Sequence, residues 1–164
     1  MKQRTSCSDS SPHFRAAPGP AGRGSERAGL LKSNGSVLVM DDEPVMRSVT
    51  SLMLEKSGYH AFAVKDGEEA VETFTKAMEC GAPFDAVILD LNIPSGMGGR
   101  ETAGKLLEID PFVKLIVASG DVADPALTNF KEYGFCAALS KPFTLDELQR
   151  ELERVTAGGR CGDN

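Results

Sequence analysis

Val37-Leu-Val-Met-Asp-Asp-Glu-Pro44 marks the point at which this 164-residue chain changes character. A short apolar run ends there in two carboxylates, and a proline follows at a position that suits the start of a helix. Further short apolar runs occupy residues 59–64, 86–89, 113–118 and 135–139. Most of these runs are nearly continuous rather than alternating, which is typical of strands that are covered on both faces.

Segments with helical spacing of apolar residues separate the runs. In the first segment Val45, Val49, Leu52 and Met53 form the predicted apolar stripe, and in the last one Thr144-Leu-Asp-Glu147 forms a capping box. A fourth helix is predicted to begin at Pro125 and to be halted by Gly134. Strand and helix therefore alternate, which predicts an α/β fold: a doubly wound, five-stranded parallel sheet with five helices. In such sheets, ligands bind beyond the carboxyl ends of the strands.

The composition before this point is different. Residues 1–35 are rich in Ser, Gly, Pro and Arg, so we expect a disordered N-terminal arm or linker. The folded domain is predicted over residues 36–156, and a flexible tail over residues 157–164. Residues 1–32 hold six basic and two acidic residues, whereas residues 33–164 hold 12 basic and 22 acidic ones. A domain so acidic repels a phosphate backbone, so we expect no nucleic-acid binding by it.

Membrane and secretory classes are also disfavoured. No apolar stretch reaches the 18 or so residues that a membrane span needs, and the first thirty or so residues lack the apolar core of a signal peptide. The four cysteines form no C-x-x-C pair, which indicates neither a disulfide framework nor a zinc site. We therefore expect a cytoplasmic protein without membrane contact.

Polar residues follow four of the five apolar runs directly. The first run ends in Asp41 and Asp42, the third in Asp90, the fourth in Ser119, and the fifth leads to Lys141. Parallel strands bring these groups to one edge, where the carboxylates repel one another and favour a hard cation such as Mg2+. A lysine and a hydroxyl there suit the stabilisation of a phosphoryl group, and an aspartate can be its nucleophile. The spacing does not say which carboxylate attacks.

At this edge the sequence resembles the receiver domain of two-component response regulators, which has a flavodoxin-like fold with strand order 2-1-3-4-5. The motifs that carry the resemblance are Val39-Met-Asp-Asp-Glu-Pro44, Ile88-Leu-Asp-Leu-Asn-Ile-Pro94, Gly96-Met-Gly-Gly99, Ala118-Ser-Gly120 and Ser140-Lys-Pro-Phe-Thr144. They occur in the family's order from about Val37 to Val155. The Gly-rich loop 95–99 and Ala138 are also similar to receivers that are attached to hybrid sensor histidine kinases.

The resemblance implies a role for each residue at the strand ends. Asp90 is the implied phosphoacceptor, and Lys141 and Ser119 are implied to stabilise the phosphoryl group. The implied Mg2+ ligands are Asp42 directly, Asp41 largely through water, Asp90, and the backbone carbonyl of Asn92. The Lys141–Pro142 peptide is implied to be cis.

The implied function is that of a phosphorelay module. Its partner is a sensor histidine kinase or a histidine phosphotransfer protein, whose phospho-histidine donates the phosphoryl group. The domain is not otherwise an enzyme, although it catalyses its own phosphorylation and dephosphorylation. Nine residues follow Val155, so we expect output to an unknown protein by protein–protein contact, or through a larger protein of which this chain is a piece. Ala138 stands where the family often has a Tyr or Phe that moves on phosphorylation, which removes that switch.

Three other functions fit these residues less well. A receiver-like module could bind proteins without phosphorylation, but it would not need all of the polar residues at the strand ends. A phosphatase or phosphomutase with an aspartate nucleophile would need a second Asp where Asn92 stands. The stretch Gly99-Arg-Glu-Thr-Ala-Gly-Lys105 has P-loop spacing, but Leu106 replaces the Ser or Thr that would hold Mg2+.

Overall fold

A computed structural model describes residues 34–94 and 96–158. Most of the predicted N-terminal arm, residues 1–35, lies outside this range. So do Ser95 of the Gly-rich loop and residues 159–164 of the predicted tail. The disorder predicted for these termini and the domain limits 36–156 stay predictions.

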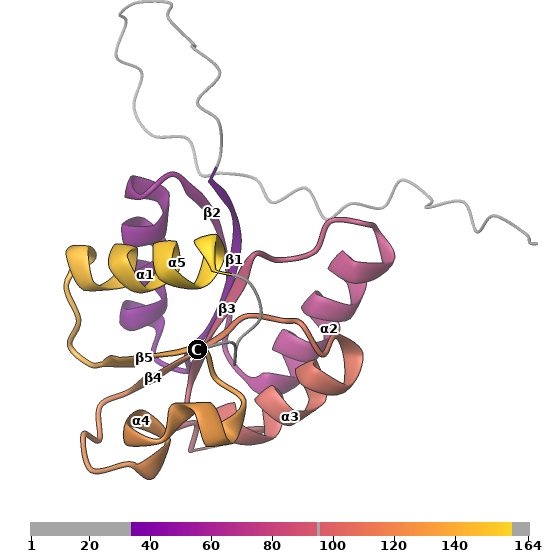
Figure 1. The fold of residues 1–164 in the computed structure, drawn as a ribbon. Coiled ribbons are helices and arrows are strands. Elements are labelled where there is room, and N and C mark those ends of the chain that lie inside the picture. Colours follow the sequence, from indigo (N-terminus) through magenta and orange to yellow (C-terminus); the bar gives the residue numbers. More distant parts are fainter. Residues whose placement is uncertain (1–33, 95, 159–164) are drawn as a thin grey trace, which may run out of the picture. The chain divides into compact units, whose positions relative to one another are not determined.

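The described part alternates strictly between strands and helices (Figure 1). Its elements are β1 (Gly35–Met40), α1 (Pro44–Lys56), β2 (Tyr59–Val64), α2 (Gly67–Glu79), β3 (Ala86–Asp90), α3 (Gly99–Ile109), β4 (Leu115–Ser119), α4 (Pro125–Thr128), a 3-10 turn (Phe130–Tyr133), β5 (Ala137–Ser140) and α5 (Leu145–Ala157). All strand pairs are parallel, and the sheet has the order β2-β1-β3-β4-β5. The predicted fold class and strand order are confirmed.

Helices cover both faces of the sheet. Helices α1 and α5 lie on one face and α2 and α3 on the other, as Figure 1 shows. Leu54 of α1 and Leu148 of α5 belong to the first core, and Phe74 of α2 and Leu106 of α3 to the second. Strands β3 and β4 are buried along their whole length, because they contact both cores. Their continuous apolar runs follow from this double burial.

The predicted apolar stripe of α1 is wrong for three of its four residues, since only Met53 packs against a core. Val45, Val49 and Leu52 are exposed, at 64%, 37% and 57%, whereas Thr50 and Leu54 are the buried residues of the helix. The helix carries apolar residues on more than one face, and Leu54 faces the sheet. Spacing alone did not separate the two faces.

The fourth predicted helix is divided into two pieces. Helix α4 ends at Thr128, and after Asn129 the chain continues as the 3-10 turn to Tyr133. Asn129 has φ −113° and ψ 37°, outside the helical region, which agrees with the weak helix propensity of asparagine. Gly134, at φ 81°, ends the segment as predicted.

Other local predictions have mixed outcomes. The capping box between Thr144 and Glu147 is present at the start of α5. Cys136 is buried and disulfide-bonded, although the spacing of the cysteines indicated no disulfide framework. Within the described ranges, no helix combines the length and the apolar character needed to cross a membrane.

Candidate functional site

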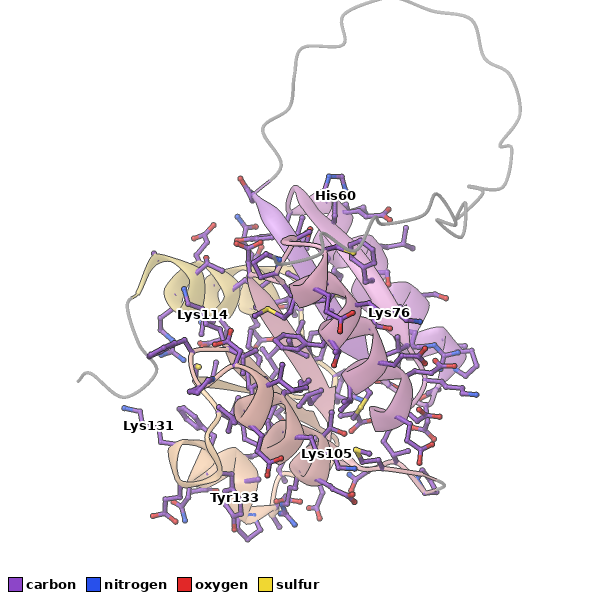
Figure 2. All side chains as sticks on the ribbon, turned by 90° about the vertical axis from the view of Figure 1, so that its right-hand side faces the viewer. His60, Lys76, Lys105, Lys114, Lys131 and Tyr133 are labelled. Atoms are coloured by element: carbon purple, nitrogen blue, oxygen red, sulfur yellow. The ribbon has the colours of Figure 1, made fainter. Side chains whose placement is uncertain are left out.

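The carboxyl ends of four strands supply the polar residues predicted for the site. Asp41 directly follows β1, Asp90 is the last residue of β3, Ser119 is the last residue of β4, and Lys141 directly follows β5. Parallel pairing of β1 with β3, β3 with β4, and β4 with β5 places these ends along one edge. His60, by contrast, lies near the start of β2, and Figure 2 shows it at the opposite end of the domain from Tyr133.

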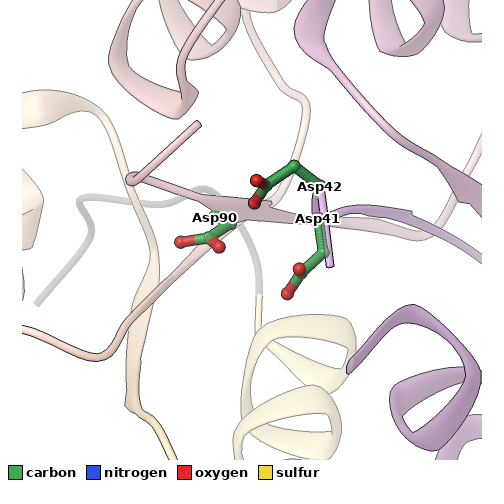
Figure 3. A group of neighbouring side chains, drawn as sticks. All are labelled: Asp41, Asp42 and Asp90. Carbon is green, nitrogen blue, oxygen red and sulfur yellow. The ribbon is translucent and has the colours of Figure 1, made fainter. Parts of the chain in front are cut away.

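Three carboxylates meet at this edge (Figure 3). Asp41, Asp42 and Asp90 each offer an oxygen atom, and these atoms lie within 4.8 Å of one another. Asp41 and Asp90 are buried, and Asp42 is exposed. Oxygen donors of this kind are the ligands that Mg2+ prefers, and carboxylates so close together repel each other without a cation. The residues present therefore fit a magnesium ion.

Lys141 joins two of the three carboxylates. Its Nζ atom donates to Oδ2 of Asp41 at 2.6 Å and to Oδ2 of Asp90 at 2.7 Å. Burial lowers the pKa of the Lys141 ammonium, but the hydrogen bonds and charges of Asp41 and Asp90 outweigh this effect and raise the pKa above its ordinary value. The lysine is therefore a permanent cation at neutral pH, held against the buried carboxylates.

Ser119 and Asn92 form the polar side of the site next to Asp90. The Asn92 backbone N–H donates to Oδ1 of Asp90 at 3.1 Å, and its side-chain amide donates to Oγ of Ser119 at 3.3 Å. The same hydroxyl accepts from the Asp121 backbone N–H at 3.1 Å. Ser119 is fully buried and ties the loops that follow β3 and β4 together.

The peptide before Pro142 adopts the cis form that the resemblance implied. The Lys141 backbone N–H donates to the Ser119 carbonyl at 2.8 Å, so the pairing of β5 with β4 continues to Lys141, the residue before the proline. The neighbouring Phe143 is buried in the core beneath α5. The backbone on both sides of the Lys141 side chain is therefore held, by β4 before it and by the core after it.

Gly99 allows the start of α3 to lie against the end of β3, close to the site. A Cβ atom at Gly99, the first residue of α3, would overlap the main-chain oxygen of Asp90. The helix that starts at Gly99 also accounts for the P-loop spacing, because residues 99–105 are helical and form no phosphate-binding loop. The P-loop alternative is thereby excluded on structural grounds.

The loop that follows β4 is anchored to α3. Arg100 forms an ion pair with Asp124, whose carboxylate also caps α4 by accepting from the Ala126 backbone N–H at 2.8 Å. The Arg100 guanidinium lies 5.2 Å from the ring centre of Tyr133. Ala138 of β5 is partly buried against the core beneath α2 and α3, and its methyl group is too small to replace an aromatic ring on that face of the sheet.

Sequence reasoning missed one charged contact of the acidic pair. Nη1 of Arg47, in α1, donates to the main-chain oxygens of Asp41 at 2.7 Å and Asp42 at 3.0 Å. The sequence does show an arginine in the first turns of the helix that follows the two aspartates. It does not show whether the arginine side chain turns back to the aspartates or points into solvent.

The chain is similar in sequence to known proteins. The family model described as the response regulator receiver domain matches residues 37–153. The chain is 28% identical over 121 residues to sporulation initiation phosphotransferase F of Bacillus subtilis, covering 74% of this chain and 93% of that protein. It is 31% identical over 119 residues to the response regulator receiver protein CpdR of Brucella abortus, covering 73% of this chain and 94% of that protein.

Solved structures agree with these relatives. The receiver domain of the sensor histidine kinase PA1611 from Pseudomonas aeruginosa, solved with a magnesium ion coordinated in its active-site cleft, matches with a TM-score of 0.66 and 26% identity. The match covers 76% of this chain and 98% of that domain. Since the family match spans most of the sequence and the fold agrees with that of a solved receiver, the chain belongs to the family of response regulator receiver domains of two-component signalling.

Proposed function

We propose that this domain accepts a phosphoryl group on Asp90 from the phospho-histidine of a partner protein, in a reaction that requires Mg2+. The observation that carries the proposal is the Lys141 ammonium, which lies between Asp41 and Asp90 in a group of three carboxylates. A site built only to bind a protein surface has no need to gather these like charges, because their repulsion costs stability.

Each residue has a role in the proposed transfer. An Asp90 carboxylate oxygen attacks phosphorus, the P–N bond of the donor breaks, and its electron pair returns to the imidazole nitrogen. Lys141 pairs with the negative charge that the phosphoryl group brings, and the Ser119 hydroxyl donates to one of its oxygens. Hydrolysis of the aspartyl phosphate by water resets the domain.

Asp41, Asp42 and Asp90 would hold the metal, together with the Asn92 backbone carbonyl. When bound, Mg2+ neutralises charge on the phosphoryl oxygens and orients the group for transfer. Lys141 and Asn92 also keep the Asp90 carboxylate in place without the metal. Lys141 donates to one Asp90 oxygen, and the Asn92 backbone N–H donates to the other.

The proposed partners are a sensor histidine kinase or a histidine phosphotransfer protein as donor, and a further protein that reads the output by direct contact. The autoinducer sensor kinase/phosphatase LuxN of Vibrio campbellii contains a similar segment, 28% identical over 130 residues, which agrees with a donor of this class. A cytoplasmic location and the absence of nucleic-acid and membrane binding stay predictions from the sequence.

An intact-mass measurement tests the proposal. The full chain is incubated with Mg2+ and acetyl phosphate, beside Asp90→Ala and the control Asp146→Asn, which changes an aspartate in the first turn of α5. A gain of one phosphoryl group in the wild type and the control, but not in Asp90→Ala, supports the proposal. Labelling of Asp90→Ala would show another acceptor. No labelling of the wild type and no Mg2+ binding would favour the phosphorylation-independent binding module.

A further inference from the structure

Arg47 contacts the acidic pair from outside the group of carboxylates. Its backbone N–H forms the first hydrogen bond of α1, to the Glu43 carbonyl at 3.0 Å, so the residue is fixed at the start of the helix. Its half-buried side chain turns back, and Nη1 donates to the main-chain oxygens of Asp41 and Asp42. We propose that Arg47 is a positioning residue that sets the affinity of the site for Mg2+ by fixing the direction of the Asp42 side chain.

The two carbonyl groups define the backbone at Asp42. The Asp41 oxygen belongs to the peptide plane before Asp42, and the Asp42 oxygen belongs to the plane after it. Because peptide groups are planar, holding both oxygens fixes the two backbone dihedral angles of Asp42. Those angles determine where its Cβ atom points and thus where its carboxylate can reach.

Asp41 and Asp42 differ in how much they depend on this contact. The Asp41 carboxylate accepts from Lys141 at 2.6 Å and from the Glu43 backbone N–H at 2.9 Å, so it is held by other groups as well. Across residues 34–94 and 96–158, the exposed Asp42 carboxylate has no hydrogen bond or ion pair. Its position rests on the backbone, which Arg47 holds together with the hydrogen bond from the Glu43 N–H to the Asp41 carboxylate.

An arginine suits this task. The guanidinium stays protonated at any physiological pH, and hydrogen bonds from a charged donor are stronger than those from a neutral one. Groups that orient metal ligands without touching the metal commonly change metal affinity by tenfold or more when they are removed. The inference rests on the proposed function, because it takes Mg2+ as the ligand.

Calorimetric titration of the full chain with Mg2+ tests the inference. We expect Arg47→Gln to bind Mg2+ about tenfold more weakly than the wild type, because the loss of Arg47 frees the Asp42 backbone. Arg47→Lys keeps the charge on a flexible stem, so its affinity should lie between the two. The matched control is Arg154→Gln. Arg154 also donates to a main-chain oxygen, that of Cys136 at 2.9 Å, but it lies in α5 and contacts none of the three carboxylates.

Urea unfolding without Mg2+ separates positioning from a general loss of stability. A purely structural role would lower the unfolding midpoint of Arg47→Gln without changing its Mg2+ affinity. Wild-type affinity in Arg47→Gln, or an equal loss in Arg154→Gln, would overturn the inference while the proposed function stands. If Arg47→Gln does not fold, wild-type affinity in Arg47→Lys overturns it. Failure of the wild type to bind Mg2+ would overturn both proposals.

Discussion

The Asn92 side-chain amide donates a hydrogen bond of 3.3 Å to the Ser119 hydroxyl. Asn92 lies in the loop after β3, and Ser119 is the last residue of the neighbouring strand β4. The same oxygen accepts from the Asp121 backbone N–H, so one buried hydroxyl serves two donors from two loops. In the proposed phosphorylated state this hydroxyl would turn to the phosphoryl group. The two loops would then lose their common acceptor, and this links the chemistry to the loop after β4.

Ser119→Ala is expected to destabilise the domain by about 0.5–1.5 kcal/mol, because it removes the acceptor of two hydrogen bonds whose donors, on the exposed Asn92 and Asp121, can turn to water instead. The control is Ser140→Ala. Ser140 pairs in register with Ser119 on the neighbouring strand but is exposed, so its loss should change stability by less than about 0.5 kcal/mol. Urea unfolding measures both values. Equal effects of the two changes would contradict the hydroxyl's role as a shared acceptor.

Asp42→Asn is expected to stabilise the domain without Mg2+ by about 1 kcal/mol, since it removes one of three like charges at short distance in water-like surroundings. The same change should remove most of the stabilisation that Mg2+ gives the wild type, because a bound ion at free concentration c stabilises the folded state by RT ln(1 + c/Kd), which falls as Kd rises. Unfolding curves with and without Mg2+ measure both effects, and Asp146→Asn is the matched surface control. A less stable Asp42→Asn, or an undiminished Mg2+ effect, would speak against the assigned role.

Two glycines of α3 should respond to alanine in opposite directions. Gly104 is exposed in the middle of the helix, and a Cβ atom there would meet nothing within 4 Å, so Gly104→Ala should stabilise by roughly 0.5–1 kcal/mol. Gly99→Ala would place its methyl group on the Asp90 main-chain oxygen, and the overlap should cost about 1–3 kcal/mol. Thermal or urea unfolding compares the two variants. Stabilisation by Gly99→Ala would show that α3 does not need this close approach.

Glu147 should make the stability of α5 depend on pH. Hydrogen bonds from the Thr144 backbone and side chain lower the pKa of the Glu147 carboxyl below its ordinary value. A lowered pKa in the folded state gives stabilisation that is complete above the ordinary pKa and is lost as the pH falls through the lowered one. We therefore expect Glu147→Gln to be less stable than the wild type at neutral pH. The gap should narrow on acidification, which unfolding curves between about pH 7 and about pH 3 would follow. A gap that is independent of pH would exclude the charge as its cause.

The sequence predicted well what the backbone alone determines. Strands β3 and β4 are buried on both faces, so their continuous apolar runs and the polar residues at their ends could be read directly. Asp41, Asp90, Ser119 and Lys141 were found because parallel strands bring their carboxyl ends to one edge, whatever the side chains do. The hydrogen bonds among them depend on rotamers, which the spacing does not contain.

The sequence predicted less well which face of a helix is buried and where a helix ends, because one pattern of apolar residues fits more than one arrangement. The exposed Val49 and the buried Leu54 lie on the same helix, and only the contact of Leu54 with the sheet shows which face is inside. Asn129 interrupts a segment that has helical spacing. The turn of Arg47 towards the Asp41 and Asp42 carbonyls depends on a long side chain with several rotatable bonds, for which the sequence gives no signal.

Lys141 lies 100 residues from Asp41 and 51 residues from Asp90 along the chain, yet it contacts both. It follows β5, the strand at the edge of the sheet that pairs only with β4 among the described elements. A nascent or nicked chain that lacks this strand would still carry Asp90 but not its ammonium partner. In the proposed reaction, phosphoryl transfer to Asp90 would therefore depend on both β1 and β5 being in place, because Asp41 follows the first of these strands and Lys141 follows the second.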